Sequence, residues 1–147
     1  MREIEFRGIV ECDGRRNWVY GFYLKSAARD GNARHHIVEE DGLTYDIDPE
    51  TVSQYTGLTD KNGVKIFDGD FVMRRNTESI GIENKILYLV SFENGAFVMK
   101  PKDSYYPYRF AYEGYSLHKD YSMLQQFKKE APWTNGSYEV IGNIHGL

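Results

Sequence analysis

The sequence predicts a mainly β protein built from two β parts that a short helical turn connects. Two observations lead to this class: short runs of alternating apolar and charged residues recur along the chain, and Asp-Gly or Asn-Gly pairs separate them. Alternation with a period of two is typical of half-buried strands, and these dipeptides favour the tight turns of hairpins. We expect an N-terminal β part over residues 1–47, a junction over 48–66 and a C-terminal β part over 67–147, together forming one compact unit.

The composition is that of a folded globular protein, because 41% of the 147 residues are hydrophobic and 27% are charged. The net charge of −4 argues against a protein built mainly to bind phosphate groups. The single cysteine, Cys12, cannot form an internal disulfide, which favours a reducing compartment. No apolar run approaches the roughly 18 residues of a membrane span. We therefore expect a cytoplasmic protein that does not associate with membranes.

The N-terminal part opens with a predicted hairpin. Ile4 and Phe6 alternate with charged residues, which indicates a half-buried strand, and Asp13-Gly14 supplies a turn. The run Trp18–Leu24 predicts a second strand that is apolar on both faces. Gly21 within it indicates a bulge or a close approach of another backbone segment.

Two adjacent histidines occupy the next predicted strand, Ala33–Val38. Neighbouring side chains of a strand point to opposite faces, so His35 and His36 cannot easily bind one ion together. No cysteine or carboxylate stands at a recognisable ligand spacing from them. We expect surface histidines and no metal site. Tyr45–Ile47 predicts another short strand.

A short helix is predicted from Asp48 to Gly57. Asp48 is a good N-cap, and Pro49 fits the first helical position. Val52 and Tyr55 stand three residues apart and would form one buried face. Gly57 would end the helix in a left-handed conformation.

The acidic residues of this region do not fit a calcium-binding loop. An EF-hand needs oxygen ligands at positions 1, 3 and 5, glycine at position 6 and glutamate at position 12. A loop that starts at Asp60 places Val64 at position 5, and one that starts at Asp46 places Thr51 at position 6. Both registers fail, so these carboxylates are interpreted as helix caps and turn formers.

The C-terminal part is predicted as a set of antiparallel strands. Asn62-Gly63 and Asp68–Asp70 indicate turns before a strand that starts at Phe71, and the polar stretch Arg74–Asn84 predicts a mobile loop. The strongest strand, Lys85–Phe92, places alternate apolar side chains on one face. Asn94-Gly95 and Ala96–Met99 complete a hairpin with it, and Tyr138–His145 predicts a final strand that closes the sheet begun at Phe71.

An aromatic segment lies between these elements, in an insertion at about residues 101–135. It suggests a contact surface made by Tyr105, Tyr106, Tyr108, Arg109, Phe110, Tyr112 and Tyr115. Tyrosine is enriched at protein interfaces, whereas aromatic and basic residues together also suit single-stranded nucleic acid. Nearby acidic residues dilute the positive charge, which favours self-association. A helical spacing follows at Leu117, Tyr121, Leu124 and Phe127, and it ends at Ala131-Pro132.

No catalytic arrangement stands out. The chain has no G-x-S-x-G elbow, no phosphate-binding glycine loop and no H-E-x-x-H pair. Nothing selects one pair of carboxylates for acid–base chemistry. We expect a protein without catalytic residues and without a cofactor.

Several blocks match a known family in order along the chain. They are Arg2–Gly8, Asn17–Gly21, Asp48–Gly63, Ile66–Asp70 and Glu139–Ile144. Together they resemble the YopX family of phage and prophage proteins, although residues 101–135 match no block. The residues that carry the resemblance are Trp18, Tyr20, Asp48, Pro49, Thr51, Val52, Gln54, Tyr55, Thr56, Gly57, Asp60, Asn62, Gly63, Gly69, Asp70, Ile141 and Gly142.

The resemblance implies a mainly β, phage-encoded protein with a barrel-like part, oligomeric assembly and a role that is not established. We therefore expect the C-terminal part to form a small SH3-like barrel. The helical spacing from Leu117 to Phe127 adds one short helix near the C-terminus. We expect a non-enzymatic accessory protein that self-associates in the cytoplasm of a bacterial host. The alternative is a small-barrel module that binds nucleic acid in phage regulation or replication.

Overall fold

The computed structural model describes residues 3–78, 82–104 and 138–147, and these residues form β-strands and turns without a helix. The prediction of a mainly β protein is therefore confirmed. The chain divides into two compact units, residues 1–57 with Leu147 and residues 58–146. The division falls inside one strand, β5, between Gly57 and Leu58.

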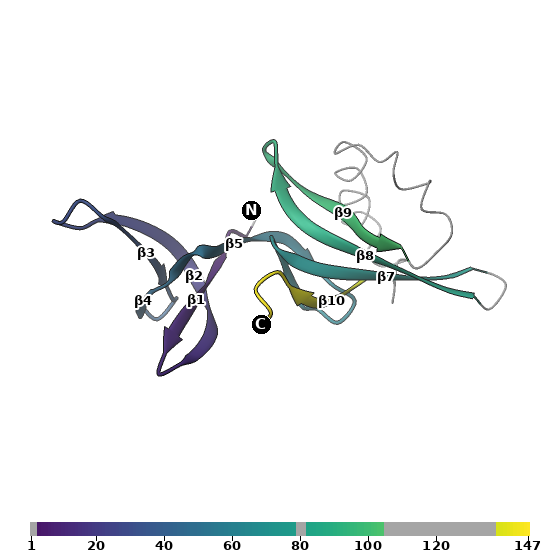
Figure 1. Ribbon diagram of the computed structural model, residues 1–147, viewed down its shortest axis with the longest axis horizontal. Helices are drawn as coiled ribbons and strands as arrows, with labels where there is room; N and C mark the ends of the chain where they lie inside the picture. Colours follow the sequence, from purple (N-terminus) through teal and green to yellow (C-terminus); the bar gives the residue numbers. More distant parts are fainter. Residues whose placement is uncertain (1–2, 79–81, 105–137) are drawn as a thin grey trace. The chain divides into compact units, whose positions relative to one another are not determined.

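The first unit is an antiparallel sheet in the strand order β4-β3-β2-β1-β5 (Figure 1). Its strands are β1 (Phe6–Cys12), β2 (Arg15–Ala27), β3 (Ala33–Val38), β4 (Thr44–Asp46) and β5 (Asp48–Thr59). The predicted first hairpin is confirmed. Asp13 and Gly14 join β1 to β2 with φ angles of 52° and 72°, the left-handed conformation that matches the twist of a two-residue hairpin.

The long strand β2 changes its partner near the middle. It pairs with β1 from Arg15 to Gly21 and with β3 from Phe22 to Ala27. At the change, the Val38 backbone passes so close that a Cβ on Gly21 would lie 2.1 Å from the Val38 carbonyl oxygen. The predicted close approach at Gly21 is confirmed, and it explains why this position has no side chain.

The predicted helix from Asp48 to Gly57 is wrong, because these residues form most of β5. Asp48 does accept a hydrogen bond from the Glu50 N–H through Oδ1 at 3.0 Å, as an N-cap would, but the chain then continues extended. Its backbone pairs with β1, where Ser53 lies opposite Arg7. Tertiary pairing supplies the hydrogen bonds that a helix would have supplied locally.

The second unit contains an open antiparallel sheet in the order β10-β7-β8-β9. Its strands are β7 (Asp70–Glu78), β8 (Ile82–Glu93), β9 (Ala96–Ser104) and β10 (Tyr138–Asn143), and the short β6 (Lys65–Phe67) follows β5. The expected closed barrel is wrong for the described residues, because β9 and β10 form opposite edges of this sheet and do not pair. A barrel requires the first and last strands to meet.

In this unit the predicted hairpin of β8 and β9 is confirmed, whereas the loop predicted before β8 is wrong. Asn94 and Gly95, with φ angles of 50° and 80°, join β8 to β9, and β10 pairs with β7 as expected. The stretch Arg74–Asn84, expected as a mobile loop, instead extends β7 to Glu78 and starts β8 at Ile82. This polar sequence forms paired strands because the backbone N–H and C=O groups of β7 and β8 form hydrogen bonds with each other.

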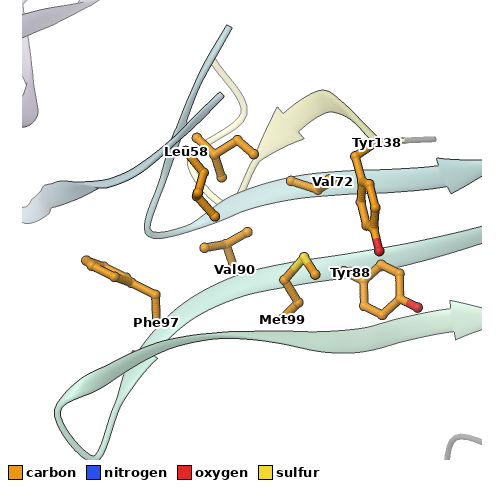
Figure 2. Close-up of a cluster of buried hydrophobic side chains, with 8 residues drawn as sticks. Leu58, Val72, Tyr88, Val90, Phe97, Met99 and Tyr138 are labelled. Atoms are coloured by element: carbon orange, nitrogen blue, oxygen red, sulfur yellow. The ribbon is translucent and has the colours of Figure 1, made fainter. Parts of the chain in front are cut away.

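Each unit has its own buried apolar cluster. In the second unit it combines Leu58, Ile66, Val72, Tyr88, Val90, Phe97, Met99 and Tyr138 (Figure 2). Tyr88 and Val90 occupy one buried face of β8, in agreement with the predicted alternation, whereas Phe92 on the same face is half exposed. In the first unit Val19, Ile37 and Ile47 are buried together, with five partly buried neighbours around them.

Candidate functional site

The predicted tyrosine-rich surface, Tyr105 to Tyr115, lies outside the described residues, and so does the helix predicted from Leu117 to Phe127. Their interpretation stays a prediction. Within the described ranges no helix has the length and apolarity needed to cross a bilayer. The same ranges contain no group of three or more His, Cys, Asp or Glu side chains able to hold a metal ion.

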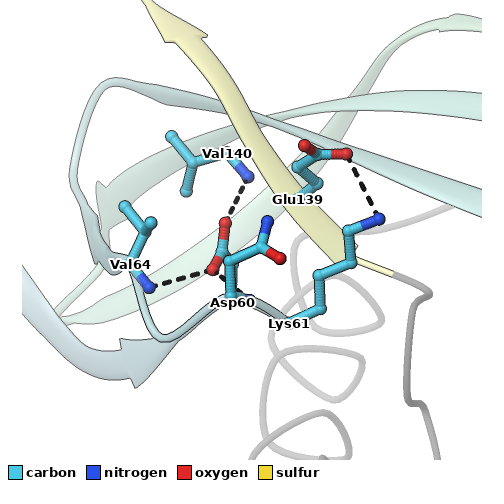
Figure 3. A network of polar contacts seen from close by, with 6 residues as sticks. Asp60, Lys61, Val64, Glu139 and Val140 are labelled. Carbon is cyan, nitrogen blue, oxygen red and sulfur yellow. Dashed lines mark hydrogen bonds and ion pairs between the residues drawn. The ribbon is translucent and has the colours of Figure 1, made fainter.

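Asp60 is the centre of a network that links the turn before β6 to β10 (Figure 3). Its Oδ1 accepts hydrogen bonds from the Asn62 and Val64 N–H groups at 2.8 and 2.9 Å. Its Oδ2 accepts one from the Val140 N–H at 3.0 Å, which is 80 positions away in sequence. Lys61 reinforces the link through an ion pair with Glu139 at 3.4 Å. This carboxylate is buried and holds two distant segments together.

Asp70 and Thr51 have similar roles at other strand boundaries. The buried Asp70 accepts a hydrogen bond from the Phe67 N–H at 2.8 Å, across the turn between β6 and β7. Thr51 Oγ1 accepts from the Ile9 N–H at 2.8 Å and donates to the Asp48 carbonyl at 2.6 Å. The acidic and hydroxyl groups of the long central block therefore bind backbone.

A buried cation lies between β1, β2 and β5 in the first unit. The Arg7 side chain is 5% exposed, and its Nε donates to Ser53 Oγ at 3.0 Å. Its guanidinium carbon lies 4.1 Å from the centre of the Trp18 ring, in the position of a cation–π contact. Arginine suits this site because its planar group can stack on the ring and donate a hydrogen bond at the same time.

The two histidines have separate partners on the two faces of their strand. His35 Nδ1 lies 2.6 Å from the Tyr23 hydroxyl, and the two rings stack. His36 Nε2 lies 2.9 Å from Ser26 Oγ, and its Nδ1 lies 2.6 Å from Asp46 Oδ1. The two side chains do not share a site, as the strand geometry predicts.

Ser26, His36 and Asp46 follow the order of a nucleophile relay, an arrangement that the sequence reasoning missed. In such a relay the carboxylate is buried and aligned with the histidine N–H. Here the Asp46 side chain is 76% exposed, and its oxygen makes no aligned hydrogen bond with Nδ1. The three groups come from neighbouring strands and connect β2, β3 and β4 across one face. We interpret them as a cross-strand network.

A fork opens in the first unit where β1 and β2 separate. The ladder between these strands ends at the pair Phe6 and Gly21. The preceding residues 3–5 leave β2 and approach β5, where the Glu5 carbonyl accepts a hydrogen bond from the Tyr55 N–H at 2.8 Å. Between the two arms lies a cavity of about 410 Å³, lined by Glu3, Ile4, Glu5, Tyr20, Gly21, Phe22 and Glu40.

The lining of this fork cavity combines apolar walls with negative charge. Ile4 and Phe22 supply exposed apolar surface, at 57% and 64% of their full exposure. The lining contains three glutamates and no lysine, arginine or histidine. The cavity therefore favours a ligand that carries positive charge on an apolar body.

Exposed apolar residues continue from the fork along β2. Tyr20, Phe22 and Leu24 alternate on one face of the strand, and each is at least 42% exposed. The sequence showed that this strand is apolar on both faces, but it could not show that only one face would be covered. Exposed patches of this kind mark interaction surfaces more often than structural ones.

The fold and these sites define an antiparallel β protein of two units whose buried carboxylates fix its turns. The chain belongs to the YopX protein family: the family model matches residues 6–146, nearly the whole length. The match also covers residues 101–135, where the sequence alone suggested no family block. No curated protein matches the sequence.

Proposed function

We propose that this chain is a phage- or prophage-encoded accessory protein, non-enzymatic and self-associating, in the cytoplasm of a bacterial host. Its YopX family membership supports a phage-type protein. The buried Asp60, Asp70 and Thr51 accept hydrogen bonds from backbone N–H groups of this chain, which gives them a structural role. A role that depends on protein contacts then has to come from surfaces.

The observation that carries self-association is the apolar surface around β10 in the second unit. Val64, Ile141 and Ile144 are each about half exposed. The Asp60 network holds the turn that contains Val64 beside β10, and the Ile144 N–H donates to the Gly69 carbonyl at 3.0 Å. Ile141 stands at the bulge of β10. Hydrogen bonds thus hold the segments that carry these three apolar side chains, and such ordering lowers the entropy cost of burying them against a second copy.

The nucleic-acid alternative has no comparable support among the described residues. Its proposed contacts, Tyr106 and Arg109 among them, lie outside those residues. The fork cavity is lined by glutamates, which repel phosphate groups. Salt-sensitive binding of single-stranded DNA or RNA that Tyr106→Ala or Arg109→Ala weakens would restore this alternative.

Light scattering coupled to size-exclusion chromatography tests self-association. We expect a dimer or larger species at micromolar concentration, and a shift toward monomer in a Val64→Ser, Ile144→Ser double variant because an apolar contact is lost. Leu43→Ser is the matched control: it removes an exposed apolar side chain from a turn of the first unit and should leave the mass unchanged. A clean monomer at micromolar concentration would overturn the proposal.

A further inference from the structure

We propose that the fork between β1 and β2 binds an extended, basic segment of a partner protein. The segment would add to the open edge of β2 and place an arginine or lysine side chain in the fork cavity. This inference takes one element from the proposed function, namely that the protein acts by contacting other proteins. It does not depend on self-association, which uses the second unit.

The first argument is the open edge itself. From Phe22 to Ala27, β2 pairs with β3 on one side, and β1 is no longer beside it on the other (Figure 1). Alternate residues of an antiparallel strand direct their N–H and C=O groups to opposite sides. Half of the backbone groups of Phe22–Ala27 therefore face the side that β1 has left. An extended peptide can satisfy them by adding as a strand.

The second argument is the chemistry at the start of this edge. The lining of the cavity of about 410 Å³ includes Phe22, the first residue of β2 beyond its ladder with β1. Ile4 and Phe22 would contact the aliphatic stem of a long basic side chain, and the glutamates of the lining, Glu40 among them, would meet its charged group. A strand on this edge and a basic side chain in the cavity are thus compatible with one ligand.

The third argument selects the partner. Nucleic acid is disfavoured, because its phosphates would meet three glutamates and no basic group in the lining. A second copy of this chain that paired edge to edge through the same fork would bring two such acidic linings together, and like charges across an interface are unfavourable. A basic segment of another protein has the complementary charge. Exposed Tyr20 and Leu24 extend the surface that its apolar residues would cover.

The proposal is tested by titrating the full chain with a peptide. Fluorescence anisotropy measures the affinity, and backbone amide NMR shifts locate the binding site. The probe is a labelled heptapeptide of alternating valine and arginine, and the control peptide carries glutamate in place of arginine. We expect the arginine peptide to bind and the glutamate peptide not to bind. The amide shifts should concentrate in residues 3–5 and 22–27.

Glu40→Lys is the informative variant, because it reverses one charge of the lining at an exposed turn residue. We expect it to weaken the arginine peptide about tenfold at low salt, with a smaller loss as salt rises. Glu50→Lys, an equally exposed reversal outside the lining, should change affinity little beyond the common effect of net charge. Phe22→Ser should weaken binding at every salt concentration, since it removes apolar contact.

Three outcomes would overturn the proposal: no binding at about 1 mM peptide, equal loss in Glu40→Lys and Glu50→Lys, or amide shifts outside the fork. Preferential binding of single-stranded DNA at the same residues would also overturn it. The result is separable from self-association. A monomer that binds the peptide contradicts only the self-association proposal, whereas an oligomer that ignores the peptide contradicts only the fork.

Discussion

The two units stabilise similar antiparallel sheets by different means. Among the residues that the structure describes, the second unit buries a cluster of eight hydrophobic residues, whereas the first buries a cluster of three with partly buried neighbours. Both units also bury polar groups: Arg7, Thr51 and Ser53 form side-chain hydrogen bonds in the first, and Asp60 and Asp70 fix turns of the second. Hydrophobic stabilisation is proportional to the apolar area removed from water, so the second unit gains more stability from its core.

Because of this difference, we expect the two units to differ in their contributions to stability and to partner binding. The larger apolar cluster of the second unit contributes more burial, and its buried Asp60 adds backbone hydrogen bonds. The first unit leaves one face of β2 apolar and exposed, and from Phe22 onward the edge of β2 that β1 has left has no strand partner among the described residues. We therefore expect the second unit to dominate stability and the first to present the partner-binding surface. Three changes test this comparison.

The largest expected effect is that of Tyr88→Ala in the second core. Tyr88 is fully buried, and its truncation should reduce the free energy of unfolding by about 4 kcal/mol. Tyr45→Ala makes the same chemical change at a partly buried position of the first unit and should cost roughly 1.5 kcal/mol. Urea denaturation measures the loss, and amide hydrogen exchange assigns it to a unit. Equal losses would show that the two cores contribute alike.

Asp60→Ala should have the next largest effect. It removes a buried carboxylate that accepts three backbone hydrogen bonds and leaves the Val140 N–H without this partner, so the expected cost is about 3 kcal/mol. The control is Asp41→Ala in the first unit, where an exposed carboxylate accepts one local bond from the Leu43 N–H. Its expected cost is about 0.5 kcal/mol. If amide exchange in β10 stayed at its original rate in Asp60→Ala, the network would not hold the two segments together.

Gly21→Ala should have the smallest effect, and it probes the fork directly. The new Cβ would meet the Val38 carbonyl oxygen, a backbone atom that cannot turn away, so β2 and β3 must separate at a cost of about 2 kcal/mol. Gly31→Ala introduces the same methyl group in open space with a φ of 81°, at a cost of roughly 1 kcal/mol. Thermal unfolding compares the two. A Gly21→Ala protein as stable as Gly31→Ala would mean that the approach of Val38 is loose.

The candidate site was much less predictable than the turns around it. Its lining combines residues 3–5, residues 20–22 and Glu40, which no local pattern connects. Gly21 is one signal in the sequence, because a glycine inside a strand indicates a close backbone approach. The strand Trp18–Leu24 is a second signal. A strand that is apolar on both faces must have both faces covered by other elements, or it exposes one of them to solvent.

The sequence by itself determined the turns and most strands of this protein. Asp13-Gly14, Asn62-Gly63 and Asn94-Gly95 form turns where predicted, because left-handed backbone conformations depend on the local residue type. Only the tertiary structure decided that Asp48–Thr59 is a strand, since its cap residues fit a helix and its pairing with β1 is non-local. The same holds for the open second sheet and for the fork. Both depend on which strand edges meet, and that choice is made by segments far apart in the chain.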